Sequence, residues 1–304
     1  MSVRRAPIPQ DRYPPAPTPQ RKQPSKSYDD SRMPNSSKRP GPKAYLLITL
    51  FALLLVIFPF LFWYYTWFGR PLTARDLDRY FADKSKPRHA QHALVQLSDR
   101  LARHENVARW YPAVLETASS RNLELRETAA WVMGQVPTYV PFHEALLRLI
   151  HDPEPMVRRN AAPALAAFGD AAARPELVDM LQPYTVRAAT SGKLKYRLKL
   201  DDYVNPGTLV GHIGEAEVRS AVPGAVRSLN RQDGDAVNPG DPLAELSADP
   251  NHVWEALRGL YLVGQAPDLE AVQRYTRPVP GMPDRVVRQA QFTSETIQAR
   301  LSSH

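Results

Sequence analysis

The chain has 304 residues, 23% of them charged, and a formal net charge of +8 at pH 7. This length accommodates two modest domains and additional segments. The sequence contains no cysteine, which excludes disulfides, thiolate catalysts and cysteine metal sites.

The N-terminal residues 1–43 are the source of the positive charge. They hold ten Lys or Arg and three Asp, a net charge of +7, so the rest of the chain is close to neutral. A near-neutral remainder argues against a nucleic-acid partner. Ten prolines also lie in this stretch. We expect a disordered or polyproline-like tail, because such a composition cannot bury enough apolar surface to offset chain entropy.

Residues 44–68 form an apolar stretch without a charged residue. Twenty-five helical residues cross a hydrocarbon core of about 30 Å with some tilt. We expect Pro59 to kink this helix, which membrane helices tolerate. The aromatic cluster Trp63, Tyr64, Tyr65 and Trp67 at one end favours a membrane interface. The stretch therefore predicts a single-pass transmembrane helix and a membrane partner.

Helical periodicity dominates residues 73–182. Thr73 precedes Asp76 by three residues, a spacing typical of a helix N-terminus. The segments LRETAAWVMGQV (125–136) and VRRNAAPALAAF (157–168) superpose at an offset of 32, and each precedes a second amphipathic segment. A period of this length with two helices per unit predicts a solenoid. Arg126 and Arg158 occupy equivalent positions and are candidate interaction residues, either for an anion or, as we favour, for packing at a repeat junction.

These segments resemble HEAT repeats, of the short kind also found in phycobilin-lyase-like proteins. A further unit is expected at residues 249–304, since DPNHVWEALRGLYLVG resembles DPEPMVRRNAAPALAAFG. In both, the Asp-Pro pair (152–153 and 249–250) predicts an N-cap followed by a first-turn proline.

Residues 185–247 change to alternating apolar residues with Gly and Pro turns, which predicts strands. Two halves of about thirty residues align, each with a Val-Asn-Pro-Gly turn. The expected structural positions are Gly192, Val204, Pro206, Gly207, Gly224, Gly234, Val237, Pro239 and Gly240. Glycines there permit turns with positive φ, and proline suits a turn corner.

The duplicated pattern, especially DGDAVNPGDPLAEL, resembles the biotinyl/lipoyl carrier domain and the barrel-sandwich portion of membrane fusion proteins, the periplasmic adaptors. The resemblance implies a carrier lysine at the hairpin that joins the halves. Here Ile213 stands near that position and no lysine follows Lys199, so we expect no attached cofactor. Only a short connection, about Gly214 to Glu217, joins the halves, so the helical arm that such adaptors often insert there is also missing.

No catalytic or metal-binding pattern emerges. His89, His92 and His104 lie in a region that is predicted to be helical, but no carboxylate completes a metal-ligand spacing. The sequence lacks glycine-rich nucleotide-binding motifs, the Gly-x-Ser-x-Gly motif of serine hydrolases and the zinc-binding motifs of lysostaphin-type peptidases. We therefore expect no catalytic residues, no metal and no cofactor, and not an enzyme.

Together these features predict a multidomain fold: a disordered tail (1–43), one transmembrane helix (44–68), and an α-solenoid of HEAT-like repeats (73–182 and 249–304) interrupted by a small all-β barrel-sandwich hybrid (185–247). The leading hypothesis is a non-enzymatic, membrane-anchored scaffold or adaptor that binds protein partners and is accessory to a transport or secretion complex. One alternative is a self-associating transporter subunit similar to membrane fusion proteins, which would form a homo-oligomer. Another is a lyase-like or carrier-associated protein whose repeats hold a small molecule.

The positive-inside rule does not decide the orientation from the flanks alone, since five Lys or Arg precede the apolar stretch closely and six follow it. The +7 tail is costly to translocate, whereas large C-terminal domains cross regardless of charge. We expect a bacterial inner-membrane protein with a cytoplasmic N-terminus and periplasmic C-terminal domains.

Overall fold

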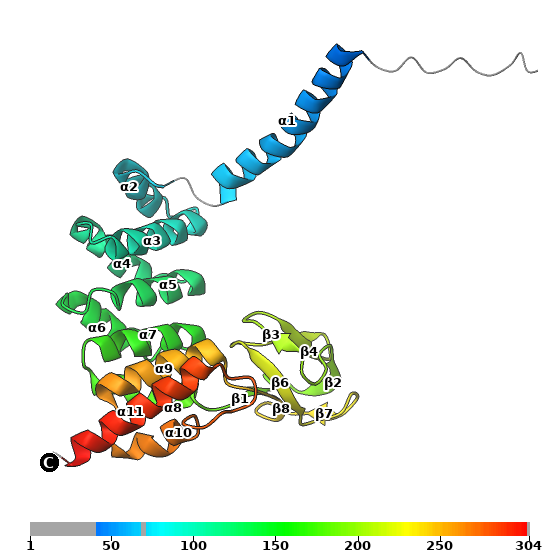
Figure 1. Cartoon of the computed structure of the whole chain (residues 1–304). Helices are drawn as coiled ribbons and strands as arrows, with labels where there is room; N and C mark the ends of the chain where they lie inside the picture. Colours follow the sequence, from blue (N-terminus) through cyan, green and yellow to red (C-terminus); the bar gives the residue numbers. More distant parts are fainter. Residues whose placement is uncertain (1–40, 68–70, 303–304) are drawn as a thin grey trace, which may run out of the picture. The chain divides into compact units, whose positions relative to one another are not determined.

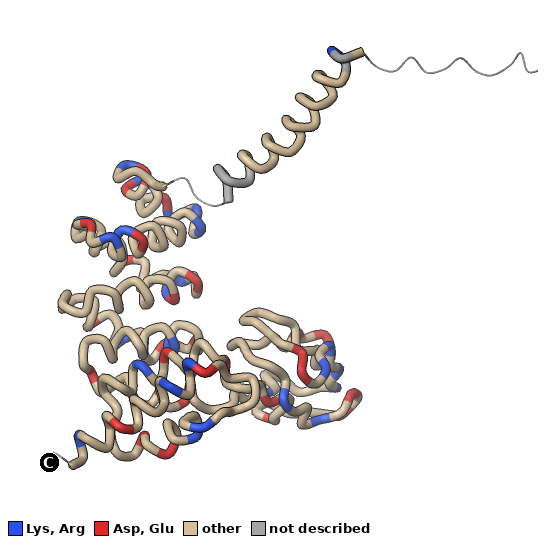
Figure 2. The backbone as a smooth tube through the Cα atoms, viewed as in Figure 1, with Lys and Arg blue, Asp and Glu red and all other residues tan. Residues whose placement is uncertain are grey.

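The computed structural model describes residues 41–67 and 71–302. The chain forms two compact units, residues 1–68 and 69–304. The described part of the first unit is helix α1 (Pro42–Trp67), which continues through Pro59. The window Tyr45–Phe62 has a mean hydropathy of 2.7 and is nowhere buried, and the middle of α1 carries no charged residue (Figure 2). By length and composition, α1 can therefore cross a membrane. Most of the predicted tail, residues 1–40, and the side chains of Trp63, Tyr64, Tyr65 and Trp67 lie outside the described residues.

The second unit contains a helical array and a β module (Figure 1). In the array, α3, α5, α7, α9 and α11 pack successively, each against the next, while α4, α6 and α8 pack along one side of this row and α10 packs on α11. The bounds are α2 (Ala74–Ala82), α3 (Pro87–Ala102), η2 (Ala108–Trp110), α4 (Tyr111–Ala118), α5 (Leu123–Met133), α6 (Val140–Leu149), α7 (Pro155–Ala167), η3 (Ala171–Ala173), α8 (Arg174–Met180), α9 (Pro250–Val263), η4 (Ala266–Asp268), α10 (Leu269–Gln273) and α11 (Asp284–Ser302). Because α9 packs on α7 and α8, the helices continue as one array on both sides of the β module.

Small residues bring consecutive repeats close together. The alanine pairs at 129–130 and 161–162 are fully buried. A Cβ added at Gly134, at the end of α5, would lie 2.7 Å from the Cβ of Ala164 on α7. The Ala-rich stretches that repeat in the sequence are thus the contact surfaces between α5 and α7.

The helix starts agree with two of the three predicted caps. Thr73 and Asp76 form a capping box at α2, and Asp249 caps α9 with Pro250 in the first turn. The prediction for Asp152 is wrong, because α7 begins two residues later, with Glu154 as N-cap and Pro155 in the first turn. Asp152 instead binds Arg126, which uses both of its carboxylate oxygens.

The β module lies between α8 and α9 and consists of two four-stranded sheets, ordered β1-β8-β6-β3 and β5-β4-β2-β7. Its strands are β1 (Tyr184–Arg187), β2 (Gly192–Tyr196), β3 (Tyr203–Val204), β4 (Leu209–Ile213), β5 (Ala216–Arg219), β6 (Gly224–Leu229), β7 (Ala236–Val237) and β8 (Pro242–Leu246). Every described strand pair is antiparallel. Each strand of the first half has an equivalent in the second: β1 and β5, β2 and β6, β3 and β7, β4 and β8. When every strand is replaced by its equivalent, the order of one sheet becomes that of the other.

Hydrogen bonds at the two Val-Asn-Pro-Gly turns repeat in the same way. The Gly207 N–H donates to the Ser220 carbonyl at 2.7 Å, and the Gly240 N–H donates to the Ala188 carbonyl at 2.8 Å. Gly207 and Gly240 have φ of +81° and +90°, a conformation that favours glycine. Each turn therefore bonds to the residue that follows the first strand of the other half: Ser220 after β5, and Ala188 after β1.

Two details differ from the sequence expectations. Gly224 has no positive φ; it is needed because a Cβ would lie 2.4 Å from the Ser247 carbonyl oxygen. The connection between the halves is only Gly214 and Glu215, since β5 already begins at Ala216. The module has its own apolar core, separate from that of the helices.

Candidate functional site

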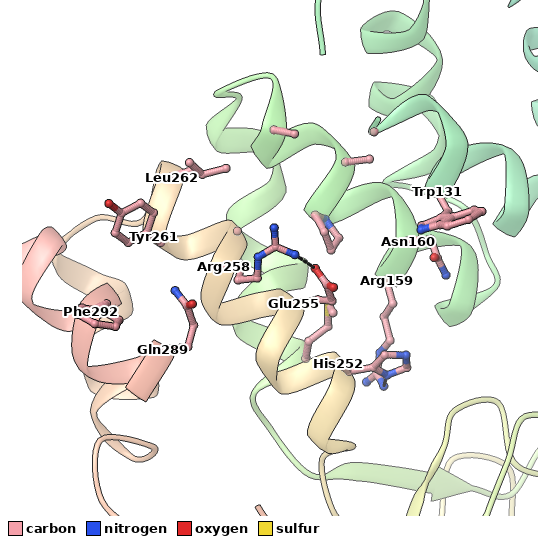
Figure 3. Close-up of a pocket in the computed structure, with 16 residues that line it drawn as sticks. Trp131, Arg159, Asn160, His252, Glu255, Arg258, Tyr261, Leu262, Gln289 and Phe292 are labelled. Atoms are coloured by element: carbon pink, nitrogen blue, oxygen red, sulfur yellow. Dashed lines mark hydrogen bonds and ion pairs between the residues drawn. The ribbon is translucent and has the colours of Figure 1, made fainter. Parts of the chain in front are cut away.

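A groove of about 810 Å³ lies across α5, α7, α9 and α11 (Figure 3). Its walls come from helices that belong to consecutive repeats on both sides of the β module. The groove therefore exists only because α9 and α11 resume the array after the insertion.

Large apolar side chains stand on opposite sides of this groove. Trp131 of α5 lies on one side, while Tyr261 and Leu262 of α9 and Phe292 of α11 lie on the other (Figure 3). Between them the lining residues include the small Pro163, Ala164, Ala167 and Gly259. This arrangement lets an occupant approach the helix backbones closely while it contacts aromatic rings at the sides.

The four large side chains are well exposed: Trp131 by 46%, Tyr261 by 42%, Leu262 by 49% and Phe292 by 59%. Isolated exposed apolar residues are normal on protein surfaces, but several large ones around a single groove are typical of a binding surface. Aromatic residues are also enriched in the centres of protein interfaces. We refer to Trp131, Tyr261, Leu262 and Phe292 as the groove quartet.

Charged residues of α9 lie between the two sides. Arg258 Nη1 and Glu255 Oε2 are 3.3 Å apart. The Arg258 guanidinium also lies 4.7 Å from the centre of the Trp254 ring, and that of Arg285 lies 5.2 Å from it. Cation–π contacts of this length are attractive, so Trp254 and Glu255 together position the Arg258 guanidinium at the groove.

A buried arginine lies at one end of the groove. The Arg159 side chain is only 4% exposed. Its Nη1 lies 3.4 Å from Nδ1 of His252, and its Nη2 lies 3.8 Å from the Asp179 carboxylate. Its Nε and the Oε1 of Glu176 are 4.0 Å apart, and neither atom has a hydrogen-bond partner.

Burial and charge set the protonation of this cluster. Burial lowers the pKa of Arg159, against the opposing effect of Asp179 and Glu176. Burial, followed by the charge of Arg159, lowers the pKa of His252 to about 4, although Asp249 opposes this. His252 is therefore neutral at pH 7, and its ring nitrogen can accept from the Arg159 guanidinium.

Arg126 and Arg158 lie outside the groove, at repeat junctions. Arg126 donates to both oxygens of Asp152, at 2.7 and 3.0 Å, and to the carbonyls of residues 120 and 121. Arg158 donates to Glu176 at 2.9 Å and to the carbonyls of residues 152 and 153. The two arginines thus make equivalent backbone contacts 32 residues apart, but their acidic partners differ: Arg126 links α5 to the loop before α7, whereas Arg158 links α7 to α8.

The remaining candidate residues do not converge on a site. His89 stacks on Tyr80 with ring centres 4.3 Å apart, and no group of three His, Asp or Glu among the described residues could hold a metal ion. Ile213 is 3% exposed and forms part of the core of the β module. Its side chain therefore faces inward, away from the hairpin tip.

Comparison with known proteins agrees with the repeat architecture. A family model for HEAT repeats matches residues 111–192, which include α4 to α8. No match is found among curated proteins. The helical array therefore contains HEAT repeats over the matched residues.

The groove quartet was not predicted from the sequence. Trp131 stands within an Ala-rich repeat helix and Phe292 within the last helix, so each has the appearance of a core residue. The available signal was that neither position falls on the buried stripe of its helix, but that stripe is clear only once the neighbouring helices are placed.

Proposed function

We propose that the protein is a membrane-anchored, non-enzymatic scaffold that binds an apolar segment of a partner protein in the groove of its HEAT-like repeats. The observation that carries this proposal is the exposed groove quartet around a groove of about 810 Å³. Helical repeat proteins use extended surfaces of this kind for binding.

The proposed location is the bacterial inner membrane, with α1 as the anchor. The length and hydropathy of α1 support this location, and the +7 tail supports a cytoplasmic N-terminus with the array and the β module in the periplasm. A topology reporter fused after His304 tests the orientation: activity on the cytoplasmic side contradicts it.

For the β module we propose a barrel-sandwich of the type found in biotinyl/lipoyl domains and membrane fusion proteins. The support is the pair of sheets whose orders interconvert when the halves are exchanged. No lysine is present at the Gly214–Glu215 hairpin, so we assign the module a docking role rather than that of a carrier.

Site-specific photocrosslinking tests the groove directly. A photoreactive phenylalanine analogue at Phe292 should crosslink to a discrete protein in native membranes. The same analogue at Val140, which is 64% exposed on α6 but does not line the groove, should not. Crosslinks of equal yield at both positions, or none to protein at Phe292, would contradict the proposal.

A second variant set separates binding in the groove from general surface stickiness. Trp131→Ser should abolish the crosslink from Phe292, because Trp131 lies on the opposite side of the same groove. Leu200→Ser, at an exposed apolar residue of the β module, should leave the crosslink unchanged.

The volume of the groove also favours a second candidate, a small apolar ligand, because pockets for such ligands typically measure about 300–1,000 Å³. Native mass spectrometry of the purified protein distinguishes the two. A bound small molecule that Trp131→Ser removes would favour the second candidate over the first.

A further inference from the structure

Four cations alternate along β2 and the three residues that follow it: Lys193, Lys195, Arg197 and Lys199. All four are exposed, whereas the residues between them are buried or half-buried. Leu194 is a member of the apolar core of the β module, and Tyr196 and Leu198 pack against that core. Because side chains alternate along a strand, Lys193 and Lys195 share one face of β2 about 6.6 Å apart, and the same alternation of exposed and less exposed residues continues through Lys199.

The row has no acidic partner. Among the described residues, none of the four cations lies within 4.0 Å of a carboxylate oxygen. Asp233 accepts from the backbone N–H of Tyr196. On the same sheet, Glu217 of the edge strand β5 pairs with Arg219 at 2.7 Å. Asp202 likewise accepts from the backbone N–H of Lys199 at 2.8 Å, so the Asp233 and Asp202 carboxylates bond to the backbone of the row rather than to its cationic side chains.

The second half of the module provides an internal comparison. The positions equivalent to the row, 32 residues later, are Ala225, Arg227, Leu229 and Arg231. Arg227 lies 3.3 Å from Asp201, and Arg231 lies 3.7 Å from Asp241. The same fold thus forms with two cations, each paired. The fold does not require the unpaired row on β2, which points to an external anionic ligand.

The shape of the row decides between anionic ligands. Single-stranded nucleic acid is bound with aromatic side chains on which bases stack. The one aromatic residue inside the row, Tyr196, instead donates its hydroxyl to the Leu243 carbonyl within the module. A row of exposed cations without stacking partners suits the phosphates of a lipid surface.

Tethering adds to this argument. Helix α2 begins at Ala74, seven residues after α1 ends at Trp67, so the β module and the proposed anchor are covalently joined in one chain. A tether converts a weak surface contact into an intramolecular one with a high effective concentration. We infer that the row of Lys193, Lys195, Arg197 and Lys199 binds the headgroups of anionic phospholipids in the membrane that anchors the chain; this inference rests on the proposed anchoring through α1.

The absence of cysteine from the sequence permits a direct test with the full-length chain. A fluorophore on Glu215→Cys, in the exposed hairpin next to β4, reports energy transfer to a labelled lipid in nanodiscs. The nanodiscs contain phosphatidylcholine alone or mixed with phosphatidylglycerol. We expect higher transfer in the anionic nanodiscs, decreasing as salt screens the charges.

Matched charge variants make the result specific. Replacing Lys193, Lys195, Arg197 and Lys199 together by Gln should remove the difference between the two nanodiscs. Replacing four other exposed arginines by Gln should keep it; these are Arg121, Arg148, Arg277 and Arg288. The circular dichroism of both variants should equal that of the parent, since only exposed side chains change.

Several results would overturn the inference. One is equal energy transfer in both kinds of nanodisc, and another is an equal decrease in energy transfer in the two charge variants. A third is that the row binds polyglutamate but does not respond to lipid charge, which would indicate an acidic protein as its ligand. Failure of the chain to enter nanodiscs would contradict the anchoring itself. The photocrosslink from Phe292 does not depend on lipid charge, so it tests the groove separately.

Discussion

Breaking the link between Arg126 and Asp152 should strongly destabilise the helical array. Their side chains are 14% and 8% exposed, and Arg126 makes four hydrogen bonds that connect two repeats. Arg126→Met keeps much of the side-chain volume but leaves the Asp152 carboxylate buried with the Glu154 N–H as a remaining partner. Removing one member of a buried pair costs about 3–5 kcal/mol, and the small residual exposure places our expectation near 3 kcal/mol.

The assay is urea unfolding of the full-length chain in detergent, followed by helical circular dichroism. Arg126→Met combined with Asp152→Asn should recover about 1–2 kcal/mol, because the second change removes the unpaired charge. The control Lys84→Met breaks an ion pair with Glu116 in which both side chains are about 60% exposed, and should cost about 0.5 kcal/mol or less. Equal effects of Arg126→Met and Lys84→Met, or no recovery in the double variant, would refute this reasoning.

The same pair predicts an acid limit to stability. Burial tends to raise the pKa of Asp152, but hydrogen bonds from Arg126 and from the Glu154 N–H outweigh it and lower the pKa. A lowered pKa stabilises the fold above the ordinary aspartate value of about 3.9, and this contribution is lost as the pH falls through the folded-state pKa. Arg126→Met should therefore weaken the acid dependence in the same titration.

Three further predictions concern packing, pH and the attachment of the β module. Gly134→Val should cost about 1–3 kcal/mol in urea unfolding, because the added carbons overlap with Ala164; an unchanged midpoint would show that α5 and α7 are not so close. The pKa of His252 is lowered to about 4, so the unfolded chain binds the extra proton first, and stability should fall as the pH drops from about 6.5 towards that value. His252→Gln should flatten this part of the pH profile, and a profile identical to that of the parent would contradict the assignment. Tyr203→Phe removes the 2.6 Å hydrogen bond from the Tyr203 hydroxyl on β3 to Asp249, the N-cap of α9. The loss should cost about 1 kcal/mol and increase the rate of limited proteolysis between the β module and α9. An unchanged rate would mean that other contacts hold the module.

Residue patterns alone were enough to predict the long apolar helix, the repeat helices and the strands of the β module. A long apolar stretch without charges is typical of a membrane-spanning helix. Residues 44–68 could therefore be recognised from the sequence as a candidate for such a helix. The 32-residue repeat placed Arg126 and Arg158 at equivalent positions, and the structure gives them equivalent backbone contacts. The cap at Asp249 was predictable from the Asp-Pro pair, because α9 begins at Pro250 and the Asp249 carboxylate accepts from backbone N–H groups of its first turn. At Asp152 the side chain had a competing partner, and the cap moved to Glu154.

Tertiary structure alone decided where a ligand can bind. Trp131 and Phe292 are 161 positions apart in the sequence, and they line the same groove only because α9 and α11 resume the array after the β module. The burial of Arg159 likewise depends on α9, which brings His252 to its guanidinium. Local patterns record which face of an element is apolar, but they do not record which distant element covers it. Exposure of an apolar face, and hence the candidate site, follows from packing between elements that are remote in the chain.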